Sequence, residues 1–361
     1  MQRKRAKRRS GPASDSPEPS GTADRAHLAR RFVRFTDEAL TYGGPLYAAL
    51  SRRIATDDDL LAIARHVRRP PVPNVFFAAV HFLLAANPAH ELAGFYGDLS
   101  DSARPPDEAF GAFRDFVLTH TAELIPLLET RITQTNEVRR CSFLLPALTV
   151  VHRSSPGRPL ALIDVGCSAG LHLVWDRYHY DYGVVQVGDP SAAVHIACEL
   201  RGPLMPPLPE RFPECPYRIG IDLNPVDLTN PTERRWFDAL IWPEHARRRT
   251  LASAAIDELL RDPPALVRGD ATNVLEPQLR AVPADTSLVV YNSAALCQGG
   301  AVEEQAVAAI VGASSEHRPI HWLHCEGEEV RWRRVDHGRT SETKLANKDG
   351  HGRWLEWVEQ S

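Results

Sequence analysis

The stretch Leu160-Ala-Leu-Ile-Asp-Val-Gly-Cys-Ser-Ala-Gly170 decides the fold class of this 361-residue chain. Its first six residues are mostly apolar and predict a short buried strand. Gly166 and Gly170 then permit a tight turn and let a ligand approach the backbone closely. A helix is expected from about Leu171, and its free N–H groups would form a positive end. The pattern is typical of ligand-binding loops, although a purely structural turn needs the same glycines.

Further apolar runs follow at intervals that fit alternating strands and helices. Strands are expected at 217–222, 266–270, 287–292 and 320–325, with helices around 232–260, 274–279 and 302–310. This alternation predicts an α/β fold with a mostly parallel sheet covered on both faces. Two last extended runs, 330–335 and 354–358, predict a C-terminal antiparallel strand pair, and alternating valines within 181–216 predict an inserted antiparallel flap.

The N-terminal part has a different character. Residues 24–150 show helical periodicity and predict an α-helical domain, which leaves 151–361 as the α/β domain. Residues 1–23 are basic and then rich in Ser, Pro and Gly, so a disordered tail is expected. The net charge is −4 overall, but without the six bases of the first nine residues the rest carries −10. An acidic body makes nucleic acid an unlikely partner.

Acidic residues stand where the first three strands of the α/β domain are expected to end. Asp222 could accept both hydroxyls of a ribose, and Asp270 could accept an adenine amino group. Asp164 could accept hydrogen bonds from loop amides or from an ammonium group. Each acid alone could also be a strand-end cap. Together with the glycine loop they predict a nucleoside site formed by Asp164, Gly166, Ser168, Gly170, Asp222 and Asp270.

Other polar residues are candidates for chemistry near this loop. Helical spacing would place Asn136 and Glu137 near Arg140, where Glu137 could be a general base, Asn136 a clamp and Arg140 a carboxylate anchor. Asn292 and Ser293 end the fourth strand and could orient a nucleophile. Tyr178 could line an acceptor pocket. The alternatives are a buried ionic network for the first group and aromatic packing for Tyr178.

The loop, the two acids and their order resemble class I S-adenosylmethionine-dependent methyltransferases, whose fold is Rossmann-like. More closely, the chain from about Arg30 resembles an uncharacterised bacterial family, domain of unknown function 2332. The motifs that carry this resemblance are PNVFFAAVH (73–81), QTNEV (134–138), GCSAGL (166–171), DRY (176–178), GIDLNPVD (220–227), RGDA (268–271) and HWL (321–323). The resemblance implies a methyltransferase-like fold and S-adenosylmethionine as cofactor, and it brings no established reaction.

Composition excludes several other classes. The six cysteines form no CxxC pair, which indicates a reduced, cytoplasmic setting without a zinc site. The longest apolar run, 75–86, is too short to cross a bilayer, so no membrane partner is expected. The expected partner is a small-molecule substrate, with homo- or hetero-oligomers left open.

Three functional hypotheses remain. The first is a small-molecule methyltransferase that uses S-adenosylmethionine. The second is an enzyme that keeps this fold without the cofactor and activates a substrate amine for displacement or ring closure in natural-product metabolism. The third is a non-catalytic partner subunit.

Overall fold

The computed structural model describes residues 21–359, and the chain divides into two compact units after Ile132. Each unit is described by itself. The expected boundary near residue 150 falls inside a helix of the second unit, α7 (Cys141–Ser154). Helix α1 begins at Gly21, within the last three residues of the expected tail, and the rest of that tail lies outside the described residues.

The first unit is helical, as expected. Its elements are α1 (Gly21–Thr41), α2 (Pro45–Ile54), α3 (Asp58–Ala64), α4 (Val72–Leu84), η1 (Glu91–Phe95), η2 (Pro106–Glu108), α5 (Phe110–Thr119) and α6 (Thr121–Thr130). The apolar helix α4 is buried along almost its whole length. Its Phe77 stacks on Tyr47 with ring centroids 4.2 Å apart, and Phe113 packs against Phe77. Aromatic packing around α4 therefore forms the core of this unit.

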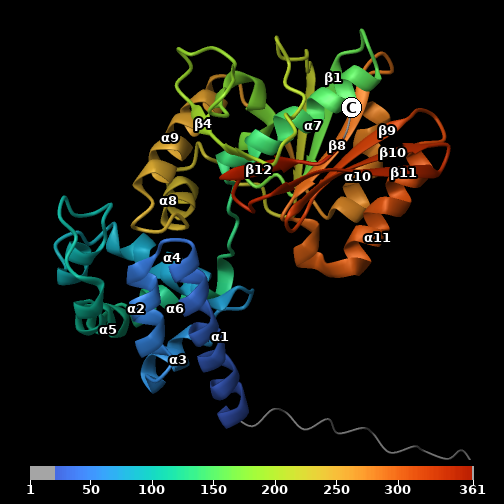
Figure 1. The fold of residues 1–361 in the computed structure, drawn as a ribbon. Helices are drawn as coiled ribbons and strands as arrows, with labels where there is room; N and C mark the ends of the chain where they lie inside the picture. The colour runs from blue at the N-terminus through green and yellow to red at the C-terminus, as the bar shows by residue number, and fades with distance from the viewer. Residues whose placement is uncertain (1–20, 360–361) are drawn as a thin grey trace, which may run out of the picture. The chain divides into compact units, whose positions relative to one another are not determined.

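The second unit is a mixed α/β structure built on a nine-stranded, mostly parallel sheet (Figure 1). Five strands run parallel: β1 (Leu160–Val165), β6 (Tyr217–Asp222), β7 (Ala265–Arg268), β8 (Ser287–Ser293) and β9 (Ile320–Cys325). The sheet order is β5-β12-β11-β10-β9-β8-β1-β6-β7. From β1, the chain first adds β6 and β7 on one side of this strand and then adds β8 and β9 on its other side. The strand order therefore reverses between β1 and β8.

Helices cover both faces of this sheet. The side chains of each strand point alternately to the two faces, so each face offers apolar residues for helices to pack on. Leu160 and Leu162 of β1 pack in one core cluster with α7, η4 (Leu171–Arg177) and α9 (Ala246–Arg261). Ala161 and Ile163 face the other way and pack with α10 (Ala271–Ala281) and α11 (Leu296–Ser314). Successive side chains of a strand point to opposite faces, so one apolar run serves two cores.

Two strand predictions need correction. The expected C-terminal pair is a three-stranded antiparallel meander of β10 (Glu329–Asp336), β11 (Arg339–Lys348) and β12 (Trp354–Trp357). The flap is not purely antiparallel: β2 (His179–Asp181) pairs antiparallel with β3 (Gln186–Val187) but parallel with β4 (His195–Ala197). The next strand, β5 (Glu199–Arg201), leaves the flap and joins the main sheet beside β12.

Candidate functional site

The glycine loop, Asp222 and the turn before Asp270 lie together at the carboxyl ends of β1, β6 and β7. Gly166 N–H donates to the carbonyl of Ile221 over 2.8 Å, and Ser168 N–H donates to Asp222 Oδ2 over 2.8 Å. Gly269 N–H donates to the carbonyl of Asp222 over 2.9 Å. This edge, beside the point where the strand order reverses, is where open α/β sheets bind ligands.

The half-buried carboxylate of Asp222 is already engaged by the protein. Besides Ser168 N–H, it accepts the backbone N–H of Asn224 over 2.8 Å and the side-chain amide of Gln134 over 3.1 Å, both on Oδ1. Three internal donors thus occupy the oxygens that were expected to bind a ribose. Asp222 closes the loop onto the segment before α7.

The space beside Gly166 is filled by Ala295, in the turn between β8 and α11. Gly166 has φ 81°, and a Cβ added to it would lie 2.1 Å from Cβ of Ala295. The glycine is therefore required by close packing of two chain segments as well as by its backbone conformation. At the reversal point of the sheet, the protein's own side chain stands where a ligand was expected to approach.

The expected helix after the loop is a 3-10 segment, η4, of 7 residues, and Val174 within it has a non-helical conformation. Its first amide is taken, because Leu171 N–H donates to Asn136 Oδ1 over 2.9 Å. The short segment and its occupied amide do not form the positive helix end that the sequence predicted. Asn136 has instead the role of a capping residue.

A buried acid–imidazole pair lies below the loop. Asp164 Oδ2 and His172 Nδ1 are 3.7 Å apart, and both side chains are almost fully buried. Burial raises the pKa of Asp164, while the nearby imidazole of His172 opposes this shift. His172 Nε2 lies 3.0 Å from the carbonyl of Glu137, and a carbonyl only accepts, so Nε2 carries a proton. The second nitrogen, Nδ1, faces Asp164 Oδ2.

The segment 134–140 is extended up to Glu137 and turns into η3 (Val138–Arg140), so the helical face expected for Asn136, Glu137 and Arg140 does not form. Glu137 pairs with Arg248 of α9 over 2.6 Å and with Arg139 over 3.3 Å. Burial acts to raise the pKa of Glu137, but the charges of Arg248 and Arg139 lower it to about 2. Glu137 is a stable anion and a weak base at neutral pH.

Arg140 joins three segments of the second unit. Its Nη1 donates to the carbonyl of Ser293 at the end of β8 over 3.1 Å, and its Nε donates to the carbonyl of Gly350 over 3.1 Å. The guanidinium is buried and bound to backbone. These contacts bring the polar segment and Ser293 together, and they leave Arg140 in the position of a structural clamp.

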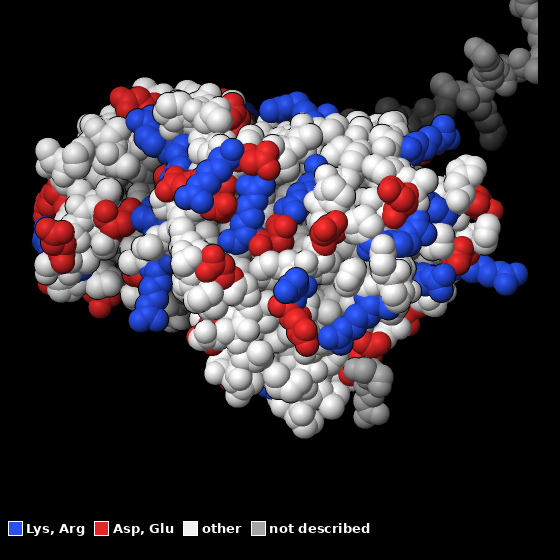
Figure 2. Space-filling model, turned by 90° about the horizontal axis from the view of Figure 1, so that it is seen from above, with Lys and Arg blue, Asp and Glu red and all other residues white. Residues whose placement is uncertain are grey.

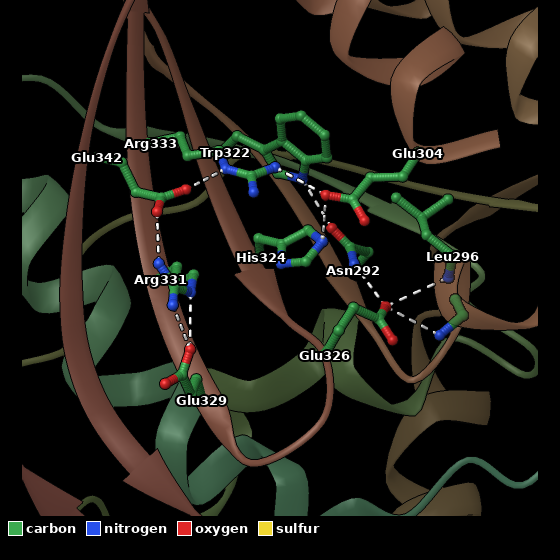
Figure 3. A network of polar contacts seen from close by, with 11 residues as sticks. Asn292, Leu296, Glu304, Trp322, His324, Glu326, Glu329, Arg331, Arg333 and Glu342 are labelled. Carbon is green, nitrogen blue, oxygen red and sulfur yellow. Dashed lines mark hydrogen bonds and ion pairs between the residues drawn. The ribbon is translucent and has the colours of Figure 1, made fainter. Parts of the chain in front are cut away.

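Asn292 is fully buried, and Figure 3 shows it between its two partners. Its Nδ2 donates to Glu326 Oε1 over 2.6 Å, and its Oδ1 accepts from Trp322 Nε1 over 2.7 Å. The same Glu326 oxygen accepts the N–H groups of Ala295 and Leu296 over 3.1 and 3.2 Å. Glu326 therefore fixes the turn that carries Ala295 against Gly166.

The remaining expected residues have structural contacts of their own. Asp270 is exposed and caps α10, accepting from the N–H and hydroxyl of Thr272 over 2.8 and 2.7 Å. Tyr178 is fully buried, and its hydroxyl donates to the carbonyl of Leu171 over 2.7 Å. Gly170, with φ 79°, packs near Leu266. Asp270 belongs to a helix cap, and Tyr178 belongs to the core.

Two residues of the cluster were missed from the sequence. Glu326 directly follows β9, so the rule used for Asp222 would also have selected it. Arg248 gave no signal, because it lies among three consecutive arginines of an ordinary helix start. Its pairing with Glu137 depends on the placement of α9 against η3.

The surface in Figure 2 carries acidic and basic side chains in an interspersed pattern. Within residues 21–359, no helix combines the length and the apolar character needed to span a bilayer. Among the side chains that the structure describes, His, Cys, Asp and Glu form no group of three or more suited to a metal ion.

Comparison with known proteins gives a family and no function. No curated protein and no solved structure matches the chain. A family model described as an uncharacterized protein conserved in bacteria matches residues 29–357, which is most of the chain and includes every residue of the cluster. The protein therefore belongs to this bacterial family, DUF2332.

Proposed function

We propose that this protein is an enzyme with a methyltransferase-like core that works without S-adenosylmethionine and activates a substrate amine for displacement or ring closure. The close packing of Ala295 against Gly166 is the observation that carries the proposal, because a cofactor lying against this glycine would have to displace that side chain. The parallel order β7-β6-β1-β8-β9, with its reversal beside β1, supports the fold assignment.

The residues at the crevice do not fit the cofactor in its expected position. Asp222 accepts three internal hydrogen bonds, and the first amide of η4 is capped by Asn136. Asp270, expected beside the adenine, is satisfied as a helix cap. A ribose and a charged amino-acid group would have to displace these bonds, each worth on the order of 1 kcal/mol or more.

The acids of this edge suit amine chemistry in different ways. Internal donors take three of the about four acceptor positions of the half-buried Asp222 carboxylate, which leaves it one hydrogen bond for an ammonium group. Asp164, whose pKa is raised by burial, is the better proton acceptor. Glu137 is ionised and held by two arginines, so we assign it a positioning role for the segment 134–140.

In the proposed step, the amine first loses a proton to a carboxylate. Its nitrogen lone pair then forms a bond to a carbon of the same substrate, and the leaving group departs with the electron pair of the broken bond. Alignment of these atoms supplies most of the acceleration.

Calorimetric titration with S-adenosylhomocysteine tests the cofactor claim on the full chain. We expect no binding to the wild type. Micromolar binding that is lost in a folded Asp222→Ala variant would overturn the proposal.

The reaction claim is tested by mass spectrometry on a panel of amines that carry a phosphate ester three or four bonds away. Release of phosphate with a cyclic product is expected, and no turnover across the panel counts against it.

The second candidate is a small-molecule methyltransferase. It is favoured by the adjacency of the glycine loop and Asp222, and by Leu223, whose side chain is 56% exposed beside that acid and offers an apolar surface for a flat base. The same titration distinguishes the two candidates, because only this one requires the cofactor product to bind.

A further inference from the structure

The second unit contains a pocket of about 270 Å³ next to the glycine loop. Its walls are mostly alanine, valine, leucine and proline side chains from three segments, namely Ala169, residues 225–229, and Leu259, Leu260, Pro263, Pro264 and Leu266. The wall is tied to the candidate site, because Val226 N–H donates to the carbonyl of Ser168 over 3.1 Å. Pro225, which opens the 225–229 wall, follows Asp222 at the end of β6.

The size of the pocket limits its ligand. A dry cavity of about 150 Å³ holds a benzene ring, and drug-sized ligands occupy at least about 300 Å³. The space here lies between these values. It suits one small saturated ring or a short branched chain, and its lining favours hydrocarbon over polar surface.

One acidic residue gives the pocket a negative charge. Asp227 lines it and is exposed, so its carboxylate stands at the rim. Thr229 holds Oδ1 of this carboxylate through its N–H over 2.9 Å and its hydroxyl over 2.6 Å. These two hydrogen bonds lower the pKa of Asp227, so the group is charged at neutral pH. The other polar lining residue, Thr229, is engaged with Asp227.

We infer that this pocket binds the hydrocarbon part of a small primary amine, with the ammonium group at Asp227. The choice of a cationic ligand rests on the proposed function, and it names the substrate class for that function: a compact alicyclic or branched aliphatic amine. The pocket shares its wall with the glycine loop, so a bound amine lies beside the carboxyl ends of β1 and β6.

Ligand-observed NMR titration of the full chain tests this with cyclohexylamine, cyclohexanol and cyclohexanecarboxylate, which share one ring and differ in charge. We expect the amine to bind about tenfold more tightly than the alcohol, and the carboxylate more weakly than both. Equal affinity for the three probes would overturn the inference.

Variants at two positions, Asp227 and Leu260, separate the effect of charge from the effect of shape. Asp227→Asn should remove the tenfold preference for the amine, whereas Asp285→Asn, which changes an exposed acid at the opposite edge of the sheet, should retain it.

Leu260→Trp should fill the pocket from its rim and weaken the binding of both amine and alcohol at least tenfold, with Leu260→Phe as a milder second variant. Leu40→Trp changes an exposed leucine of the first unit that does not line the pocket and serves as the control. Unchanged binding in the Leu260 variants would refute the site.

The outcomes for the pocket and for the reaction are distinguishable. Asp227-dependent amine binding without turnover of any phosphate ester would support the pocket and count against the reaction. Turnover that Leu260→Trp leaves unchanged would support the reaction and refute the pocket.

Discussion

At the scale of single residues, Gly166 has two separate reasons to be glycine. Its φ of 81° disfavours any side chain, and Ala295 occupies the position of its Cβ. Gly157 has a similar φ of 77° but nothing within 4 Å of its Cβ position. The two glycines therefore form a matched pair that separates backbone strain from packing.

We expect Gly166→Ala to lower the free energy of unfolding by about 2–4 kcal/mol, from strain plus overpacking. Gly157→Ala should cost only the strain, about 1–2 kcal/mol. Adding Ala295→Gly to Gly166→Ala should recover part of the loss. Urea unfolding of the purified variants measures all three, and equal losses at both glycines would mean that Ala295 does not fill the crevice.

Glu137 shows how strongly a buried charge depends on its partners. Glu137→Gln leaves Arg248 buried without its counter-ion, so we expect a loss of about 3–5 kcal/mol at pH 7. Glu276→Gln, which breaks an exposed pair with Arg280, should cost about 0–1 kcal/mol. Chemical unfolding compares the two, and similar small losses would argue against a buried ion pair.

The Glu137 carboxylate also makes the stability of the fold depend on pH in the acid range. Its folded pKa of about 2 lies below the usual 4.5, so its contribution to stability is present above about pH 4.5 and is lost as the pH falls towards 2. The free energy of unfolding, measured between pH 5 and pH 2.5, should fall less steeply with decreasing pH for Glu137→Gln than for the wild type. Parallel curves would show that the pKa of Glu137 is not lowered in the folded chain.

At the scale of elements, the turn between β8 and α11 depends on one acid from the next strand. Glu326 Oε1 accepts from Asn292, Ala295 and Leu296, so it holds both the strand end and the helix start (Figure 3). Ala294 in this turn has φ 52°, a conformation that alanine rarely adopts. The turn is thus held in place by tertiary contacts rather than by its own sequence.

We expect Glu326→Ala to destabilise the fold by about 2–3 kcal/mol, because three donors lose their acceptor. Glu326→Gln keeps one acceptor oxygen and should lose less. Hydrogen exchange at the amides of Ala295 and Leu296 provides a local readout, with faster exchange in the alanine variant. Unchanged exchange would mean that Glu326 does not hold this turn.

The elements also show where pattern reading succeeds. The bounds of β1, β6, β8 and β9 agree with the predicted ranges to within one residue. Strands β1 and β8 are mostly apolar because they are buried along their whole length, whereas β6 is partly buried and carries Arg218. Strand β11 was missed, because most of its residues are polar and its first four are exposed. Its pairing with β10 includes charged contacts such as Arg333 with Glu342, which carry no apolar signal.

At the scale of the whole molecule, the two units have separate cores. The first is built on the aromatic residues around α4 and the second on the two faces of the sheet. We expect calorimetry to resolve two unfolding transitions. Phe116→Ala in the first unit and Val290→Ala in the second should each shift a different transition. A single transition shifted by both variants would show one cooperative unit.

The sequence by itself determined the family, the alternation of strands and helices, and the meeting of the glycine loop with Asp222 at one edge. These follow from local periodicity and from the rule that parallel strands share their carboxyl edge. Only the tertiary structure decided that Ala295 fills the space at Gly166, that Gln134 and Ser168 engage Asp222, and that Arg248 neutralises Glu137. Those contacts join segments far apart in the chain. Their partners are chosen by packing and by the cost of leaving a buried polar group unpaired, which no local pattern records.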